Sequence, residues 1–138
     1  MLDELDLQIL QLLKENARLQ WKEIGAKIHM TGQAVAARIR RMEEQGVIRG
    51  YTAAIDPARC GQPLMAFITV IMKSNDHFTF LKFLEGRKEV VEAHRISGEG
   101  CYWLKACVSS QEVLGKLLDE LLKYGNYSLS LSIGEIKM

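Results

Sequence analysis

The spacing of the apolar residues changes near residue 46 of this chain. Before that point apolar side chains recur every three or four positions, which is the period of an amphipathic helix. After it come an apolar run, LMAFITVIM (64–72), and a strictly alternating segment, YSLSLSI (127–133), and both are strand patterns. The two prolines of the chain lie within residues 56–63, between these regions. The pattern predicts a helical domain at residues 1–60 that ends in a hinge, followed by an α+β domain at 61–138.

Three short helices are predicted in the first domain, within residues 2–16, 21–28 and 32–44. Thr31 is a good N-cap for the third helix, and Gly46 is a natural C-terminal stop. The segment VIRGYTAAID (47–56) is rich in β-branched and aromatic residues and predicts one or two short strands. Three helices followed by a strand pair form a winged helix-turn-helix, in which the last helix enters the major groove of DNA.

Three arginines fall within residues 38–41 of the third predicted helix. On a helical wheel Arg40 and Arg41 lie opposite the core face that carries Val35 and Ile39, and Arg38 flanks that core face. Arginine can donate two hydrogen bonds to guanine and can pair with phosphate, so this face is the predicted DNA surface. The alternative is a solvated helix face on which Arg40 pairs with Glu44. The candidate DNA contacts are Thr31, Gln33, Ala34, Ala37, Arg38, Arg40 and Arg41.

The second domain follows the order strand, helix, strand, strand, helix, strand, which is the ferredoxin-like βαββαβ arrangement. The strands are expected at about 64–73, 90–97, 102–109 and 127–133. One helix is expected at 77–84. The other is expected to open with a capping box at Ser109 and Glu112 and to stop at Gly125.

The strand at 64–73 is apolar at both alternations, which predicts burial on both faces. Two helices can cover only one face of a four-stranded sheet, so the other face needs a partner. The simplest partner is the same sheet of a second copy. The alternative is a long core strand in a monomer. The predicted dimer interface consists of Ala66, Ile68, Val70 and Met72.

Two motifs together resemble the Lrp/AsnC family of transcription regulators. They are L-D-x-x-D-x-x-I-L at 2–10 and V-x-x-R-I-R-R-M-E-E-Q-G-V-I-R-G-Y at 35–51, and the segment AAIDPARCGQP at 53–63 is similar to the hinge of that family. The resemblance extends over essentially the whole chain. It implies a helix-turn-helix at about 22–41, binding to double-stranded DNA as a homodimer, tetramer or octamer, and a second domain that senses an amino acid or another small metabolite. Gln20 departs from the Ser or Thr that usually caps the second helix.

The resemblance also implies that the turn SGEGCY (97–102) helps to line the small-molecule site. Where the family usually has Gly-Asp-aromatic-Asp, this chain has Gly100 and Cys101 in place of the aromatic residue and the second Asp. A thiol is a poor acceptor for an ammonium group, so we expect a weak response to ordinary free amino acids. The alternative is a plain glycine-rich hairpin. The candidate effector residues are Ser97, Gly98, Glu99, Gly100, Cys101 and Tyr102.

Charge, cysteine content and the length of apolar runs limit how the protein can bind DNA and where it is expected in the cell. The net charge of +1 argues against a basic coat over the whole protein, so DNA binding must come from a local surface. Three cysteines without a C-x-x-C pair predict free thiols in the cytoplasm. The longest apolar run, 64–72, is too short to span a bilayer, so no membrane partner is expected.

No catalytic or metal-binding pattern stands out in the sequence. The three histidines lack ligand spacing, and no P-loop, G-x-S-x-G or G-x-G-x-x-G motif occurs. We therefore expect no metal or other cofactor and no enzymatic activity, and we interpret Trp21 and Trp103 as packing residues. An architectural protein that bends or wraps DNA with little sequence specificity is the main alternative to a regulator. A ferredoxin-like enzyme or a stand-alone metabolite-binding module is a weaker one.

Overall fold

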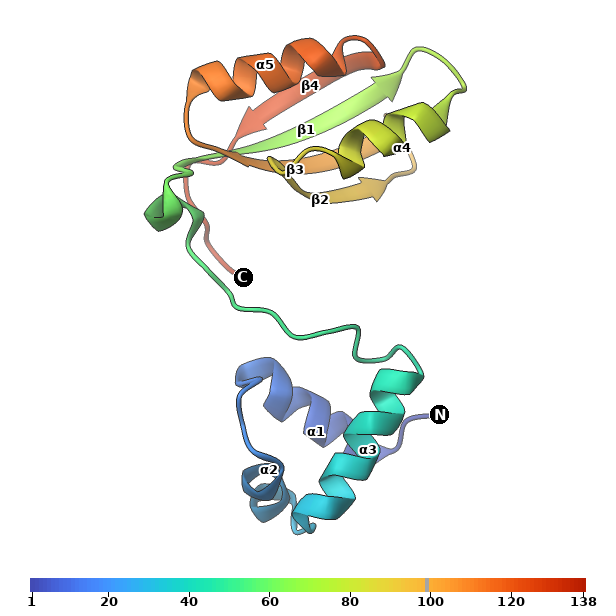
Figure 1. The fold of residues 1–138 in the computed structure, drawn as a ribbon, viewed down its shortest axis with the longest axis vertical. Coiled ribbons are helices and arrows are strands. Elements are labelled where there is room, and N and C mark those ends of the chain that lie inside the picture. Colours follow the sequence, from blue (N-terminus) through green and yellow to red (C-terminus); the bar gives the residue numbers. More distant parts are fainter. Residues whose placement is uncertain (99) are drawn as a thin grey trace. The chain divides into compact units, whose positions relative to one another are not determined.

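The computed structural model describes residues 1–98 and 100–138, which form two compact units, Met1–Ala54 and Ile55–Met138 (Figure 1). The first unit is helical, and the second contains a four-stranded sheet. The α+β class is therefore confirmed. The division falls slightly before residue 60, because the short 3-10 turn η1 (Pro57–Cys60) belongs to the second unit. None of the helices in the described residues has the length and apolar content needed to cross a bilayer.

The first unit contains the three predicted helices, α1 (Glu4–Glu15), α2 (Trp21–Ile28) and α3 (Gly32–Glu44). Polar caps fix where two of them begin. The Asp3 carboxylate accepts a hydrogen bond from the Asp6 amide at 2.9 Å, and the Thr31 hydroxyl accepts one from the Ala34 amide at 3.1 Å. Side chains from all three helices form one small core, which contains Ile9, Ile24, Val35, Ile39 and Met42.

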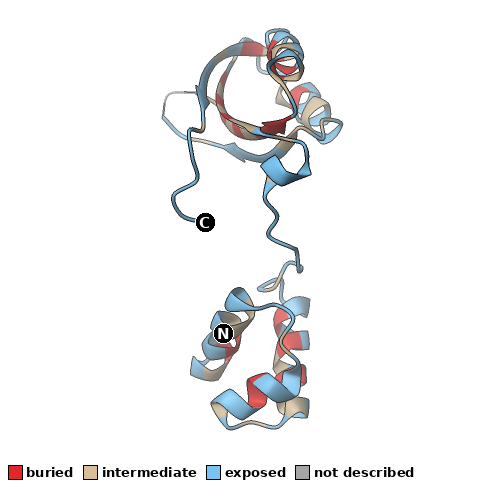
Figure 2. Cartoon of the chain, turned by 90° about the vertical axis from the view of Figure 1, so that its left-hand side faces the viewer, coloured by how far each residue is buried: buried red, intermediate tan, exposed pale blue. Residues whose placement is uncertain are grey.

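The strands predicted within residues 47–56 are wrong, because this segment belongs to no sheet. The amides of Val47 and Ile48 instead donate to the Met42 carbonyl at 2.9 and 3.1 Å and so close the end of α3. Residues 49–55 then continue without regular structure and are exposed (Figure 2). A strand needs a second edge to pair with, and β-branched composition alone supplies none. The first unit is therefore a helix-turn-helix without a wing.

The second unit follows the predicted βαββαβ order. It consists of β1 (Leu64–Met72), α4 (His77–Glu85), β2 (Val90–Arg95), β3 (Tyr102–Val108), α5 (Gln111–Leu121) and β4 (Gly125–Leu131). The sheet is antiparallel with strand order β2-β3-β1-β4. The predicted capping box of α5 is wrong by one residue, because the Ser110 hydroxyl receives the Val113 amide at 3.2 Å. Gly125 belongs to β4 and does not end the helix.

The predicted dimer interface is also wrong, because it names the covered side of β1. Helices α4 and α5 lie on one face of the sheet, and the buried residues gather between them and the strands (Figure 2). Ala66, Ile68 and Val70 are completely buried there, and Met72 packs against the same core. Both alternations of β1 are apolar, so the sequence could not indicate which one the helices cover. The open face carries the other alternation, with Met65, Phe67 and Ile71.

Candidate nucleic-acid interface

The exposed face of α3 carries three of the predicted DNA contacts, Gln33, Ala37 and Arg40, and Thr31 is exposed at the N-cap of the helix. Ala34 is half-buried beside them. The opposite face of the helix is fixed by Val35, Ile39 and Met42 in the core of the first unit. The row therefore lies on a helix whose orientation is set by packing.

Arg38 and Arg41 bind the start of α1. The Arg38 Nη1 atom lies 2.7 Å from the Asp3 carboxylate and 3.0 Å from that of Asp6, and Arg41 Nη2 lies 3.2 Å from Asp6. Asp6 is completely buried, so its carboxylate depends on these partners. Arg38 and Arg41 therefore join α1 to α3, a contact that the helical wheel did not reveal. The signal in the sequence was the pair of carboxylates at the start of α1, Asp3 at its N-cap and Asp6 in its first turn.

The guanidinium of Arg38 changes the acidity of its partner. Its hydrogen bond, followed by that from the Asp6 amide, lowers the pKa of the Asp3 carboxyl from the ordinary 3.8 to about 2. The ionised form of Asp3 is thus the one that the folded unit favours. The Arg38 side chain is 24% exposed, and its Nη1 atom is occupied by these ion pairs.

Arg40 lies over an aromatic ring. Its guanidinium carbon is 5.5 Å from the centroid of the Trp21 ring, and Trp21 is 45% exposed. Trp21 is thus only partly the packing residue that the sequence predicted. The ion pair between Arg40 and Glu44, which belonged to the alternative of a solvated helix face, is not formed, and Arg40 has no ion-pair partner within residues 1–98 and 100–138.

A groove of about 560 Å³ lies beside this pair, at the start of α2 and α3. The two helices approach closely here, because a Cβ atom on Gly32 would lie 3.4 Å from the Lys22 Cα atom. Two cationic side chains and no carboxylate line the groove. The lining residues are Trp21, Lys22, Gly32, Gln33, Ala36 and Arg40.

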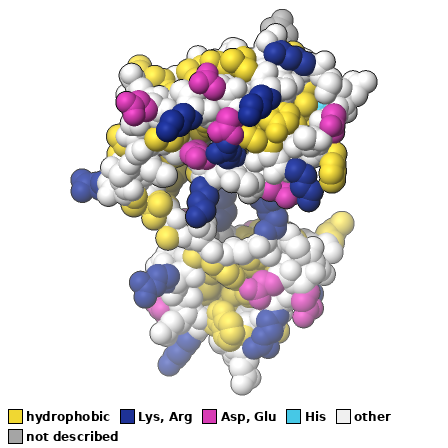
Figure 3. All heavy atoms as spheres, turned by 45° about the horizontal axis from the view of Figure 1, so that its top comes forward, with side chains coloured by type: hydrophobic (Ala, Val, Ile, Leu, Met, Phe, Trp, Pro, Cys, Tyr) yellow, Lys and Arg dark blue, Asp and Glu magenta, His cyan; other side chains and the backbone are white. Residues whose placement is uncertain are grey.

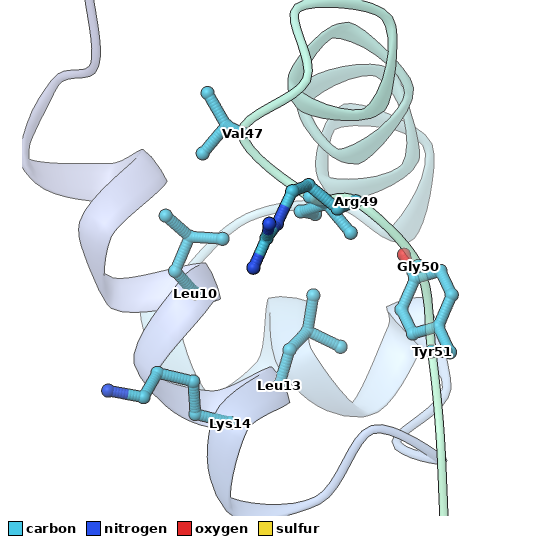
Figure 4. Close-up of a pocket in the computed structure, with 8 residues that line it drawn as sticks. Leu10, Leu13, Lys14, Val47, Arg49, Gly50 and Tyr51 are labelled. Atoms are coloured by element: carbon cyan, nitrogen blue, oxygen red, sulfur yellow. The ribbon is translucent and has the colours of Figure 1, made fainter. Parts of the chain in front are cut away.

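A second hollow, of about 390 Å³, lies between α1 and the segment that follows α3 (Figure 4). Leu10 and Leu13 line it from α1, and Val47 and Tyr51 line it from the segment. The Tyr51 hydroxyl donates to the Glu43 carboxylate at 3.1 Å and so ties the segment to α3. Burial, and then this hydrogen bond, raise the pKa of Tyr51. Sequence reasoning found neither the hollow nor this bond.

The predicted effector turn is only partly accessible. Ser97 and Gly98 are exposed, and Glu99 lies outside the described residues. Gly100 has a φ of +105°, and a Cβ atom there would lie 2.5 Å from Thr69 Cγ2. An aromatic side chain therefore does not fit at residue 100 in this conformation.

The last two residues of that turn pack inward. Cys101 is half-buried against the core of the second unit, and its amide donates to the Val70 carbonyl at 2.8 Å. Tyr102 is 3% exposed, and its hydroxyl lies 2.7 Å from His77 Nδ1. Tyr102 is thus a core residue, and the prediction that it lines an open ligand site is not supported by its position.

The open face of the sheet is the other apolar surface of this unit. The rings of Phe67 and Trp103 stack there with centroids 5.6 Å apart, and Ile71 is half-exposed. The ring centroids of His94 and Trp103 are 5.9 Å apart, and the His94 Nε2 atom is 3.0 Å from the Glu92 carboxylate. On the side drawn in Figure 3, basic and acidic side chains are interspersed, in keeping with the low net charge.

Comparison with known proteins covers both units. The AsnC-type helix-turn-helix domain matches residues 2–43, and the Lrp/AsnC ligand binding domain matches residues 65–138. The chain is 55% identical over 136 residues to the HTH-type transcriptional regulator LrpB of Bacillus subtilis, covering 99% of this chain and 91% of that protein. It is 31% identical over 124 residues to the leucine-responsive regulatory protein of Escherichia coli K12, covering 88% of this chain and 76% of that protein.

Solved structures agree with these matches. Bacillus subtilis LrpC has a TM-score of 0.94 at 28% identity, covering 99% of this chain and 98% of that one. A transcriptional regulator of Neisseria meningitidis in complex with L-Met has a TM-score of 0.92 at 29% identity, and the match covers 100% of this chain and 94% of that one. The helix-turn-helix unit and the sheet unit match in the same order, and the chain belongs to the Lrp/AsnC family of helix-turn-helix transcription regulators.

Proposed function

We propose that this regulator recognises a defined duplex DNA sequence with the first half of α3. The observation that carries the proposal is the exposed pair of Gln33 and Ala37, with the exposed N-cap Thr31 before them, on a helix held from behind by its core. Glutamine can donate to and accept from the major-groove edge of adenine, and an alanine methyl can contact the thymine methyl. The small side chain of Ala37 also lets the helix backbone approach the bases closely.

We assign Arg38 and Arg41 to a supporting role. Both arginines form ion pairs with Asp6 on α1, and these ion pairs stabilise the orientation of α3 relative to α1. Base recognition then rests mainly on Gln33 and Ala37. The protein acts by binding, and we assign it no catalytic residue.

The regulator acts as a homodimer through the open face of its sheet. Phe67, Trp103 and Ile71 give this face an apolar centre, and the same face of a second copy is complementary to it. A homodimer carries two α3 helices, so both can bind one duplex. Dimers can assemble further into tetramers or octamers.

A small molecule modulates this regulator through the turn at residues 97–101. The relative from Neisseria meningitidis was crystallised with L-Met, and its ligand is an amino acid. In this chain the half-buried Cys101 provides no carboxylate for an ammonium group. The response of this regulator to ordinary free amino acids is therefore weak or absent.

The substitution Gln33→Ala tests the assignment of α3. Binding to a pool of duplexes that differ at single base pairs should lose discrimination at one position, by about 1–3 kcal/mol. The dependence of affinity on salt should stay unchanged, because every phosphate is still neutralised as in the wild type. The matched control is Gln11→Ala, an exposed glutamine on α1. Equal base preferences in wild type, variant and control would exclude Gln33 as a base-reading residue.

A further inference from the structure

The groove at the start of α2 and α3 has the chemistry of an anion site. Lys22 and Arg40 contribute positive charge to its lining, and no acidic side chain lines it. The first residues of both helices, Trp21 and Gly32, also lie here, so the positive ends of two helix dipoles face the same space. Duplex DNA offers an anion of this kind in its backbone phosphates.

Arg40 is held in place before any DNA binds. Its guanidinium lies over the Trp21 ring and has no carboxylate partner among the described residues. A guanidinium stacked on a ring keeps its N–H donors free at its edge, where a phosphate oxygen can accept them. The ring also limits the rotamer freedom that a long side chain loses when it binds.

The position of Arg40 along α3 distinguishes a phosphate contact from a base contact. Gln33 and Arg40 lie on the same side of the helix and are separated by two turns, or about 10 Å of helix rise. The major groove is about 12 Å wide, with base edges on its floor and phosphates on its rims. If the first half of α3 meets the floor, Arg40 lies close to a rim.

We propose that Trp21 is a positioning residue that presents Arg40 to a phosphate of the DNA backbone, so that the pair contributes affinity independent of base sequence. The inference rests on the proposed function, since it needs α3 in the major groove. It assigns to Trp21 a role that packing alone does not explain, because almost half of the side chain is exposed.

A double-mutant cycle on the full-length protein tests the pair. The variants are Trp21→Ala, Arg40→Ala and the double variant, with Trp21→Phe as the conservative substitution. The probe is a labelled random-sequence duplex of about 30 bp, longer than one major-groove turn, and affinity is measured by fluorescence anisotropy at several salt concentrations. Circular dichroism confirms that each variant is folded. If Trp21→Ala does not fold, the cycle is run with Trp21→Phe.

Arg40→Ala should lower the slope of log affinity against log salt by about 0.9 for each phosphate that the variant no longer neutralises. Trp21→Ala should weaken binding roughly two- to fivefold when Arg40 is present and should have no effect in the Arg40→Ala background. Trp21→Phe should retain part of the affinity. A merely structural role of Trp21 would not produce this dependence on Arg40.

An unchanged salt slope in Arg40→Ala would overturn the phosphate contact, and additive losses in the double variant would overturn the positioning role. These failures differ from a failure of the proposed function. Wild-type protein that binds neither random duplex nor its own upstream DNA would refute DNA recognition itself. Binding of both, without coupling between Trp21 and Arg40, would refute only the inference.

Discussion

Phe67→Glu is expected to dissociate the proposed homodimer and to weaken DNA binding about 10²- to 10⁴-fold. Phe67 stacks on Trp103 at the centre of the open sheet face, so the substitution removes this stacking and places a carboxylate from each copy in an apolar interface. Affinity falls because two linked α3 helices bind one duplex far more tightly than a single helix does. Sedimentation measures the assembly state, and anisotropy titration measures the affinity.

Two further substitutions make this test specific. Phe78→Glu introduces the same change at a side chain that is 71% exposed on α4, and it should leave the dimer and its DNA affinity intact. Ile68→Glu changes the neighbouring residue on the covered face and should unfold the second unit. A Phe67→Glu protein that sediments as the wild type does would exclude the open face as the dimer interface.

Arg38→Ala is expected to destabilise the helix-turn-helix unit strongly. The completely buried Asp6 carboxylate then keeps only the more exposed Arg41 as a cationic partner, and Asp3 loses its ion pair, so the free energy of unfolding should fall by clearly more than it does in the control. Urea unfolding of full-length protein in a Trp103→Phe background follows the first unit, because Trp21 is then the only tryptophan. The matched control, Arg40→Ala on the same helix, should change stability by no more than about 1 kcal/mol.

Repeating the urea unfolding at decreasing pH tests the role of Asp3, the other carboxylate that binds Arg38. The pKa of Asp3 is lowered to about 2 in the folded protein, below its ordinary 3.8. Its contribution to stability is therefore fully present above about pH 4 and is lost as the pH falls through about 2. The stability advantage of wild type over Asp3→Asn should shrink over that window. Equal stability of Arg38→Ala and Arg40→Ala would contradict this account of the ion pairs between α1 and α3. A stability difference between wild type and Asp3→Asn that does not change with pH would contradict it as well.

Elements fixed by local chemistry could be predicted from the sequence. The helices of the first unit follow from the three-to-four spacing and from caps such as Thr31, and β4 follows from the alternation at 127–133. Features that depend on a partner could not be predicted. Residues 47–56 have strand composition but no edge to pair with, and β1 is apolar on both faces, so its covered face was chosen wrongly.

The candidate DNA surface also combines features that the sequence could predict with features that depend on tertiary contacts. The helical wheel placed Gln33, Ala37 and Arg40 outward, and the structure confirms that they are exposed. A wheel gives a direction but not a partner, so it placed Arg38 beside the core face without showing what Arg38 binds. The carboxylate of Asp3 is 35 positions away from Arg38, and Trp21 contacts Arg40 from another helix. Only the tertiary structure brings these groups together.

Footprinting of wild-type protein on the DNA upstream of its own gene, in excess random duplex at fixed salt, tests the central claim most directly. A sequence-reading dimer should protect paired sites about one helical turn apart, or a multiple of that spacing, and the protection should resist the random competitor. Uniform coverage that random duplex removes in parallel would contradict sequence recognition by α3 and would favour an architectural protein.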